Sequence, residues 1–393
     1  MQLWVPAAMT APGSGKSGYG LSTGLRQRIL REEPSPVAVT PFLAERRRFV
    51  NGKHARKPGC HYIRPMKSTL PEIPITDVSG SIGIETLMAH ERRAHRLIDA
   101  ATKGVPKAAL RALDAVSRKW LVRWNNAQLE EIDRVAALLG RPGAYYLSVN
   151  YEWGCTCRVA PSADGCSARL ARVLDWRTPG LGANVVAGRV SAKPGPYIAL
   201  TWPGYTGVLQ AMAPGRFSAA LNQAPMRRPI GLFAIDWAAN KARVWSRPHP
   251  TPAHLLRQVF ATAGDFEEAA GRLTETPIAA PCIFVLAGLG PHETVVIERT
   301  EECAEVHRGP RVAANHWQAS GWRGSARGHD SEGRSRMLCN LAPDFFGLAE
   351  WLKPPVLNPL TRLALVADAK EGRMLAQGFE GKAPATAPLE FSA

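Results

Sequence analysis

The amino-acid sequence predicts an α+β fold with antiparallel sheets, because blocks of different periodicity follow one another along the chain. Between residues 84 and 139, apolar side chains recur at intervals of three or four, the period of an amphipathic helix. From residue 145 to residue 221, short apolar segments alternate with turn residues, as expected of strands joined by tight connections. Helical patterns then return and further strands follow, which favours separate helical and β layers.

Each element has its own local pattern. Two or three helices are expected in the first block, where Leu110, Leu113, Val116 and Trp120 share one face, and Gly140 ends the last of them. Strands are expected at residues 145–150, 168–174, 184–190, 197–202, 208–212, 217–221, 283–289 and 294–299. Later helices are expected at residues 253–263, 266–273, 331–341 and 345–352, and a closing hairpin at residues 363–367 and 374–378.

Composition describes a folded chain of ordinary polarity. Of 393 residues, 45% are hydrophobic and 21% are charged, which excludes wholesale disorder and coiled-coil or collagen-like repeats. No apolar run approaches the ~18 residues of a membrane-spanning helix, and the start lacks the basic and apolar regions of a secretory signal. Seven scattered cysteines, an odd number, form no disulfide framework, so we expect a cytoplasmic setting.

The formal net charge of +16 is concentrated near the N-terminus. Residues 26–67 carry many arginines and lysines, few acids and several prolines, so residues 1–83 are expected to form an irregular basic extension. Interleaved aromatics and the spacing of zinc fingers or helix-turn-helix motifs are missing from this stretch, so no nucleic-acid partner is expected. A weak contact between the extension and an anionic membrane surface stays open.

Two sequence motifs that suggest ligands fail closer inspection. Residues 11–17 resemble a phosphate-binding loop, but Thr10 stands where the first glycine of that loop is required, and no strand precedes it. Cys155 and Cys157 are too close together for a zinc knuckle, and no second ligand pair follows at zinc-binding spacing. We therefore expect neither a cofactor nor a metal ion.

A predicted hairpin places three reactive side chains at one end of a sheet. An apolar segment reaches Gly154 and Cys155 follows it, while Arg172 and Asp175 come near the end of the next expected strand. If the two strands pair antiparallel, both charged side chains return to the end of the sheet where Cys155 lies. A buried cysteine alone is most often inert packing, but a cation beside it stabilises the thiolate and makes it a nucleophile.

At these residues the sequence resembles a known family. The Gly154-Cys155-Thr156 segment with Arg172 and Asp175, and the segments at residues 201–209 and 217–222, resemble acid ceramidase and N-acylethanolamine acid amidase. The wider kinship is with choloylglycine hydrolases and penicillin acyltransferases, whose Asn-His and Asp-Ser-x-x-Arg elements resemble residues 314–317 and 330–334. The resemblance covers residues 84 to about 380 and implies the four-layer αββα fold of N-terminal-nucleophile hydrolases.

The resemblance also implies a precursor that cuts itself. Cleavage of the Gly154–Cys155 bond would leave residues 84–154 as a helical α segment and residues 155–393 as a β segment, with a new α-amine on Cys155. An α-amine has a pKa of about 7.7–8.0, so it can take the thiol proton and return it to a leaving amine. Nucleophile and base would then belong to one residue.

Catalytic roles follow from the resemblance position by position. Cys155 would be the nucleophile and Arg172 would lower the pKa of its thiol. Asp175 would orient the α-amine, Asn315 would donate to the oxyanion, and Arg334 would brace the site. The expected substrate contacts are four aromatic side chains and one amide, namely Trp153, Trp176, Trp202, Tyr205 and Asn222. The aromatic residues fit core packing equally well.

Three departures from the family pattern bear on the assignment. Gln223 follows Asn222 where ceramidase-like sequences commonly carry an acid, which weakens a ceramidase assignment. Cys157 stands where the family more often has serine and is an alternative nucleophile. The interval from Asn315 to Arg334 is closer to that of the acyltransferases. The cytoplasmic-looking start predicts a neutral pH optimum, unlike that of the lysosomal members.

The sequence therefore predicts a cysteine amidohydrolase that cleaves linear carboxamides, such as N-acyl amines, fatty amides or ceramide-like amides, through a thioester on Cys155. Two alternatives stay open. The same thioester serves an acyltransferase when an amine replaces water as the acceptor. A non-catalytic scaffold would keep the fold and bind anionic partners through the basic extension.

Overall fold

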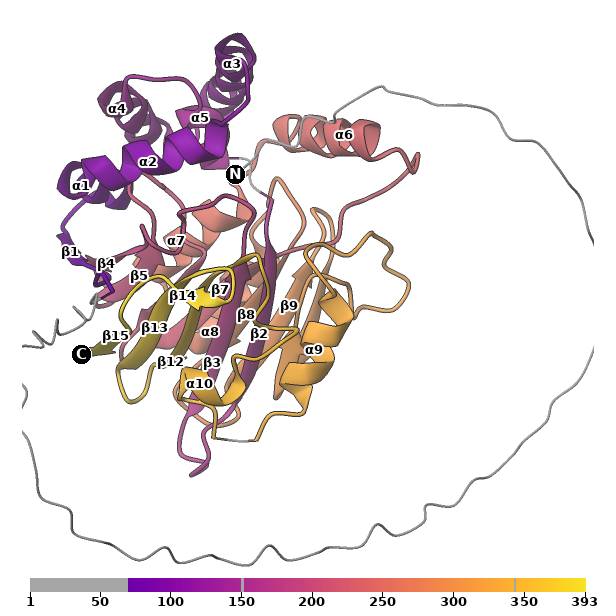
Figure 1. Ribbon diagram of the computed structural model, residues 1–393. Coiled ribbons are helices and arrows are strands. Elements are labelled where there is room, and N and C mark those ends of the chain that lie inside the picture. Colours follow the sequence, from indigo (N-terminus) through magenta and orange to yellow (C-terminus); the bar gives the residue numbers. More distant parts are fainter. Residues whose placement is uncertain (1–69, 150–151, 343) are drawn as a thin grey trace, which may run out of the picture. The chain divides into compact units, whose positions relative to one another are not determined.

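Two β-sheets lie face to face in the computed structural model, which describes residues 70–149, 152–342 and 344–393 (Figure 1). The basic stretch at residues 26–67 and the glycine-rich motif at residues 11–17 lie outside the described residues. Among the described residues, no helix has both the length and the apolar character needed to cross a membrane.

The first sheet has eight strands in the described residues, in the order β1-β4-β5-β6-β7-β8-β9-β10. Its neighbours pair antiparallel, except that β1 runs parallel to β4. The strands are β1 (Ile75–Val78), β4 (Val186–Val190), β5 (Tyr197–Thr201), β6 (Gln210–Ala213), β7 (Phe217–Gln223), β8 (Cys282–Ala287), β9 (Thr294–Arg299) and β10 (Ala304–Arg308).

The second sheet has seven described strands and is antiparallel throughout. The order is β11-β2-β3-β12-β13-β14, and β15 pairs with β13. The strands are β2 (Gly154–Pro161), β3 (Ala168–Asp175), β11 (Arg311–Ala313), β12 (Thr361–Asp368), β13 (Arg373–Glu380), β14 (Ala383–Pro384) and β15 (Leu389–Ser392). The predicted closing hairpin is therefore confirmed as β12 and β13.

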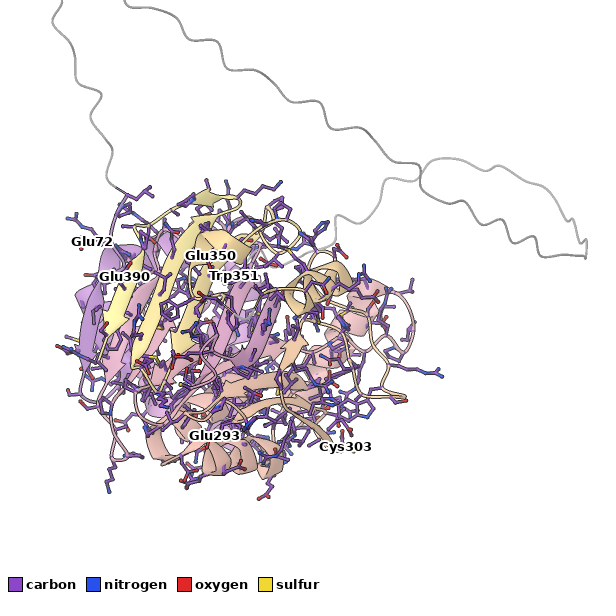
Figure 2. The ribbon with its side chains drawn as sticks, turned by 90° about the horizontal axis from the view of Figure 1, so that it is seen from below. Glu72, Glu293, Cys303, Glu350, Trp351 and Glu390 are labelled. Atoms are coloured by element: carbon purple, nitrogen blue, oxygen red, sulfur yellow. The ribbon has the colours of Figure 1, made fainter. Side chains whose placement is uncertain are left out.

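Helices cover the outer face of each sheet. Behind the first sheet, α7 (Pro252–Thr262) and α8 (Phe266–Glu275) pack on its strands, and the rings of Phe260 and Phe217 stack with centroids 4.8 Å apart. On the second sheet, α9 (Ser331–Cys339) and α10 (Leu348–Trp351) share a core with β3 and β12. Trp351 of α10 lies beside the yellow strands in Figure 2. The layers thus run helix, sheet, sheet, helix, which confirms the expected αββα arrangement.

Five helices precede β2 in the described chain, at one end of the sheets (Figure 1). They are α1 (Ile82–Ala89), α2 (Glu91–Thr102), α3 (Lys107–Arg123), α4 (Leu129–Leu139) and α5 (Ala144–Val149). The predicted helical block is confirmed, but it holds four helices between residues 82 and 139 where two or three were predicted. The strand predicted at residues 145–150 is wrong, because residues 144–149 form α5. The carboxylate of Asp114 on α3 accepts the backbone N–H groups of Gly143 (2.6 Å) and Tyr146 (2.9 Å), and this side-chain cap starts a helix there.

Two further elements differ from the sequence prediction. Residues 75–78, within the predicted irregular extension, form β1 and complete the first sheet beside β4. The sequence prediction also missed α6 (Phe233–Trp245), a helix with few buried side chains and therefore no strong apolar stripe.

Candidate active site

The hairpin of β2 and β3 brings the predicted reactive residues together, as their spacing indicated. In the observed register, Gly154 lies opposite Asp175 and Cys157 lies opposite Arg172. Side chains alternate between the two faces of a strand. Cys155, Cys157 and Arg172 therefore point between the two sheets, whereas Asp175 points toward α9.

The thiol of Cys155 lies against the guanidinium of Arg172. Nη2 of Arg172 donates to Sγ of Cys155 at 3.0 Å and to the carbonyl oxygen of Leu221 at 2.9 Å. Both side chains are fully buried. Burial raises the pKa of Cys155 to about 12, against the lowering effect of Arg172, so the thiol keeps its proton near neutral pH in this structure.

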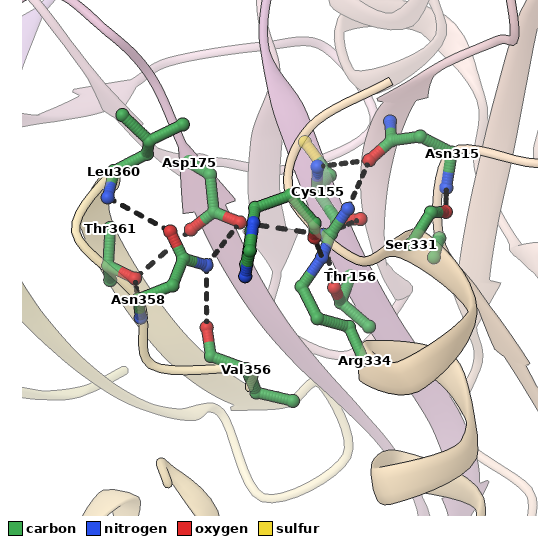
Figure 3. Close-up of polar contacts among 12 residues, drawn as sticks. Cys155, Thr156, Asp175, Asn315, Ser331, Arg334, Val356, Asn358, Leu360 and Thr361 are labelled. Atoms are coloured by element: carbon green, nitrogen blue, oxygen red, sulfur yellow. Dashed lines mark hydrogen bonds and ion pairs between the residues drawn. The ribbon is translucent and has the colours of Figure 1, made fainter. Parts of the chain in front are cut away.

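The backbone of Cys155 is held on both sides. Its N–H donates to Oδ1 of Asn315 at 2.7 Å, and Nη1 of Arg334 donates to its carbonyl oxygen at 2.7 Å (Figure 3). Arg334 also donates to Oγ1 of Thr156 at 2.6 Å and to Oδ1 of Asn315 at 3.1 Å. The peptide bond before Cys155 is thereby fixed beside its own sulfur.

Asn315 has a different orientation from the one that an oxyanion donor requires. Its Oδ1 accepts two hydrogen bonds, one from Cys155 and one from Arg334, which fixes which end of the amide is the oxygen. Its Nδ2 donates to the carbonyl oxygen of Gln223 at 2.7 Å. In this structure the amide nitrogen is therefore engaged, and the oxyanion role stays a prediction.

Asp175 is buried in a ring of donors. Its carboxylate accepts from Nδ2 of Asn358 at 2.8 Å and from Oγ1 of Thr361 at 3.1 Å, and it lies 3.5 Å from Nη1 of Arg334. Burial raises the pKa of Asp175, and Arg334 opposes that rise. Asn358, in the loop before β12, and Thr361, the first residue of that strand, were not predicted, because neither belongs to a motif or a periodic pattern.

The start of α9 places Arg334 at the site. Asp330 adopts a left-handed conformation (φ 41°) and accepts the N–H of Gly333 at 3.0 Å as the helix cap. Gly328 has φ +74°, and a Cβ there would lie 2.8 Å from Nη2 of Arg334 and 3.1 Å from Cα of Gly154. The loop before α9 can approach Gly154 this closely only because both positions are glycine.

Cys157, the alternative nucleophile, is part of a buried network. Its Sγ donates to Oδ1 of Asn222 at 3.1 Å, and Nη1 of Arg172 lies 3.9 Å from that sulfur. Nδ2 of Asn222 donates to the carbonyl oxygen of Ala313 at 3.0 Å. Asn222 thus links β7 to β11 and holds Cys157, an environment different from the substrate contact that was expected for it.

Two hollows are lined by the expected aromatic residues, and one of them is also lined by Gly154. A cavity of about 370 Å³ is lined by Trp153, Gly154, Asp175 and Trp176, among others. An apolar pocket of about 110 Å³ is lined by Trp176, Trp202 and Tyr205 and by side chains of α2, α4 and α5. The ring of Trp176 lies 5.3 Å from that of Trp153 and 5.7 Å from that of Trp202. Trp176 therefore borders both hollows.

Metal ligands are not assembled at this site. In residues 70–149, 152–342 and 344–393, no group of three or more His, Cys, Asp or Glu side chains is arranged to hold a metal ion. All six cysteines in these ranges are free thiols.

Comparison with known proteins gives partial matches. No protein-family model matches the chain. Human acid ceramidase is 34% identical over 102 residues, which are 26% of this chain and 24% of the relative. The N-acylethanolamine-hydrolyzing acid amidase of Caenorhabditis elegans is 28% identical over 166 residues, 42% of this chain and 44% of the relative. The chain thus spans about a quarter of the length of the acid ceramidases that it matches.

A solved structure matches about half of the chain at low similarity. The Caenorhabditis elegans N-acylethanolamine-hydrolyzing acid amidase ortholog superposes with a TM-score of 0.44 and 23% identity, over 54% of this chain and 92% of the other. The sequence matches confirm the resemblance to acid ceramidases and N-acylethanolamine acid amidases. The described layers are those that the resemblance to N-terminal-nucleophile hydrolases implied.

Proposed function

We propose that this chain is a cysteine amidohydrolase that activates itself by cutting the Gly154–Cys155 bond and then hydrolyses linear N-acyl amides. One observation carries the proposal. The sulfur of Cys155 lies 3.0 Å from Arg172, while the N–H and carbonyl of the same residue are held by Asn315 and Arg334. A thiol beside a buried cation, on a residue whose backbone is fixed, is arranged for nucleophilic attack.

Self-cleavage uses the thiol of Cys155 against the carbonyl of Gly154. The C–N bond breaks as the C–S bond of a thioester forms, and the thiol proton passes to the nitrogen, which becomes the α-amine. Water then attacks the thioester, leaving a carboxylate on Gly154 and a free thiol on Cys155. The pair of Asn315 and Arg334 holds the attacking residue in register throughout.

Substrate hydrolysis repeats the same bond changes with an external amide. The α-amine of Cys155 takes the thiol proton, and Arg172 stabilises the thiolate that forms. The thiolate attacks the amide carbonyl, and the α-ammonium gives its proton to the departing amine. Water releases the acid from the thioester. Asp175 orients the α-amine and Arg334 braces the site, and Asn315, once its amide nitrogen leaves Gln223, donates to the oxyanion.

The acyl half of the substrate belongs in the apolar pocket beyond Trp176. Trp176, Trp202 and Tyr205 line it together with aliphatic side chains, so an alkyl chain would replace water against apolar surface. The names of the matched relatives, ceramidase and N-acylethanolamine-hydrolyzing amidase, fit an acyl amide with a hydrocarbon chain. A cytoplasmic location is part of the proposal, since free thiols are usual in reducing compartments.

The test combines chain cleavage with amide hydrolysis. Intact mass spectrometry should find two fragments that meet between Gly154 and Cys155, and the cut protein should release ethanolamine from N-dodecanoyl ethanolamine. Cys155→Ala should remain one chain and release none. Added hydroxylamine or a primary amine reports acyl transfer, because a new amide would then accumulate in place of dodecanoic acid. An uncut wild-type chain without activity would support the scaffold alternative instead.

A further inference from the structure

A partly buried cluster of charges lies beside the proposed cleavage site, on residues that the mechanism above does not use. The carboxylate of Glu152, two residues before Gly154, lies between two cations. Oε1 of Glu152 is 3.1 Å from Nζ of Lys241 on α6, and Oε2 accepts from Nη1 of Arg327 in the loop before α9. Both cations come from the β segment, whereas Glu152 belongs to the segment that cleavage separates.

The two cations share a single counter-ion. Within the described residues, Glu152 is the one acidic side chain in ion-pair range of either Lys241 or Arg327. The side chain of Lys241 is 10% exposed and that of Arg327 is 16% exposed. Burial lowers the pKa of Lys241 to about 8 and that of Arg327 to about 10, because the charged form of each side chain is poorly solvated.

Two members of the cluster, Glu152 and Arg327, line the cavity beside Gly154, and Lys241 lines a smaller pocket that shares Trp153 with it. Glu152, Trp153 and Gly154 line the 370 Å³ cavity together with Arg327 and with Trp237, whose ring lies 5.7 Å from Nζ of Lys241. Gly154 is bonded to Cys155, so in the proposed mechanism an external amide takes the place of the Gly154 carbonyl only after residues 152–154 withdraw. Their withdrawal removes the carboxylate from Lys241 and Arg327 and leaves two mostly buried cations without an anion, an unfavourable state.

We propose that Lys241 and Arg327 form a carboxylate-binding subsite, which Glu152 fills in the uncut chain and the substrate fills after cleavage. The subsite selects amides whose amine half carries a carboxylate, namely N-acyl amino acids. This inference rests on the proposed amidohydrolase function. The carboxylate belongs to the amine half because the acyl half occupies the apolar pocket on the other side of Trp176, which has no cation among its lining residues.

Additional positive charge surrounds the same cavity. Arg177 and Arg228 also line it, and Arg228 lies 3.6 Å from Asp236. The other acid on its wall, Asp175, is already paired with Arg334. A carboxylate entering this cavity therefore meets an excess of cations, which favours its approach and its retention.

The test compares two amides that share an acyl chain. N-dodecanoylglycine carries a carboxylate where N-dodecanoyl ethanolamine carries a hydroxymethyl group. The cut wild-type protein should hydrolyse the glycine amide with a kcat/KM at least about tenfold higher, as expected for one charge-assisted contact. Lys241→Gln should remove most of this preference through a higher KM for the glycine amide. Lys193→Gln, at an exposed lysine between β4 and β5, should keep the preference.

A comparison of substrates on the wild-type protein alone tests the subsite even if Lys241→Gln does not fold. The methyl ester of N-dodecanoylglycine lacks the charge, so the wild-type protein should hydrolyse its amide bond no better than that of the ethanolamide. A third substrate, the mono-ethanolamide of dodecanedioic acid, carries its carboxylate at the end of the acyl chain and should show no preference. Preference for this third substrate would overturn the assignment to the amine half.

The remaining outcomes separate this inference from the proposed function. Equal kcat/KM values for the glycine amide and the ethanolamide in the wild-type protein would overturn the subsite while leaving the amidohydrolase intact. If neither amide is hydrolysed, calorimetry with N-dodecanoylglycine on the cut protein decides. Binding that depends on Lys241 would support the subsite and contradict the amidohydrolase, and no binding would overturn both.

Discussion

Nη1 of Arg334 lies 3.5 Å from the carboxylate of Asp175, and both side chains are completely buried. This pair joins α9 to the end of β3 on the face of the second sheet opposite the thiol. The same guanidinium holds the carbonyl of Cys155, so the pair couples the stability of the fold to the position of the nucleophile.

Removing the charge of Arg334 should therefore affect both folding and cleavage. Arg334→Gln leaves the Asp175 carboxylate buried without its cation, and breaking a buried pair in this way costs about 3–5 kcal/mol. Urea unfolding should register the loss, and intact mass spectrometry should find the chain uncut. Arg336→Gln, two residues along α9 and exposed, is the control and should change the free energy of unfolding by less than about 0.5 kcal/mol. An Arg334→Gln protein of wild-type stability would contradict the pairing.

The close approach of Gly328 to Gly154 predicts a steric block to cleavage. Gly328→Ala places a methyl group 2.8 Å from Arg334 and 3.1 Å from Cα of Gly154, in addition to the strain of φ +74°. Gly321 has φ +79°, but a Cβ added there would have no atom within 4 Å. Gly321→Ala therefore introduces the backbone strain without a steric clash. Both variants should lose about 1 kcal/mol of stability from strain, but only Gly328→Ala should slow the appearance of the two fragments.

Cys157 should be dispensable for chemistry. Cys157→Ala removes one hydrogen bond to Asn222, whose Oδ1 keeps a contact of 3.4 Å with Arg172, so the expected loss of stability is about 1–2 kcal/mol. Cleavage and amide hydrolysis should persist in Cys157→Ala and disappear in Cys155→Ala. The reverse pattern would identify Cys157, and not Cys155, as the nucleophile.

Removing Arg172 should suppress the thiolate. A cation within about 4–6 Å lowers the pKa of an acid by one to three units, so Arg172→Met should reduce the reactive thiolate by about ten- to thousandfold. Single-turnover kinetics of thioester formation should show that loss, while Arg172→Lys, which keeps the charge, should recover part of the rate. A wild-type rate in Arg172→Met would contradict the role of this residue.

The pH dependence should separate the α-amine from the carboxylate subsite. The α-amine acts as a base only when unprotonated, so kcat/KM for the ethanolamide should rise with pH up to about 8 and favour a neutral over an acid optimum. Lys241, with its pKa lowered to about 8, is charged below that pH. Titration of the α-amine affects both substrates equally, so it cancels in the ratio of kcat/KM for the glycine amide to that for the ethanolamide. This ratio should therefore fall above pH 8. An acid optimum, or a ratio that stays constant, would contradict these assignments.

The sequence predicted what depends on local pattern and short spacing. The sequence predicted that Arg172 and Asp175 would return to Cys155 if Cys155 began a strand antiparallel to residues 168–174, and the pairing of β2 with β3 meets that condition. The sequence could not predict α5, because its cap comes from Asp114, twenty-nine residues before Gly143. It could not predict β1 either, because that strand is stabilised by pairing with the distant β4.

The missed site residues come together only through the tertiary fold. Asn358 reaches Asp175 across 183 residues of sequence, and Lys241 reaches Glu152 from a helix that lacks a strong apolar stripe. A lone asparagine or lysine in such segments carries no pattern of its own. The roles of Asn315 and Arg334 were predicted through the family resemblance, while the orientation of the Asn315 amide is set by Gln223 and Arg334 and required the structure.

The central claim is that the active nucleophile is the first residue of its own chain. N-terminal sequencing of the larger fragment, performed on samples taken as activity develops, tests this directly. We expect a fragment that begins Cys-Thr-Cys-Arg, in an amount that rises in proportion to amide hydrolysis. Full activity in a preparation that yields no such fragment would contradict the account.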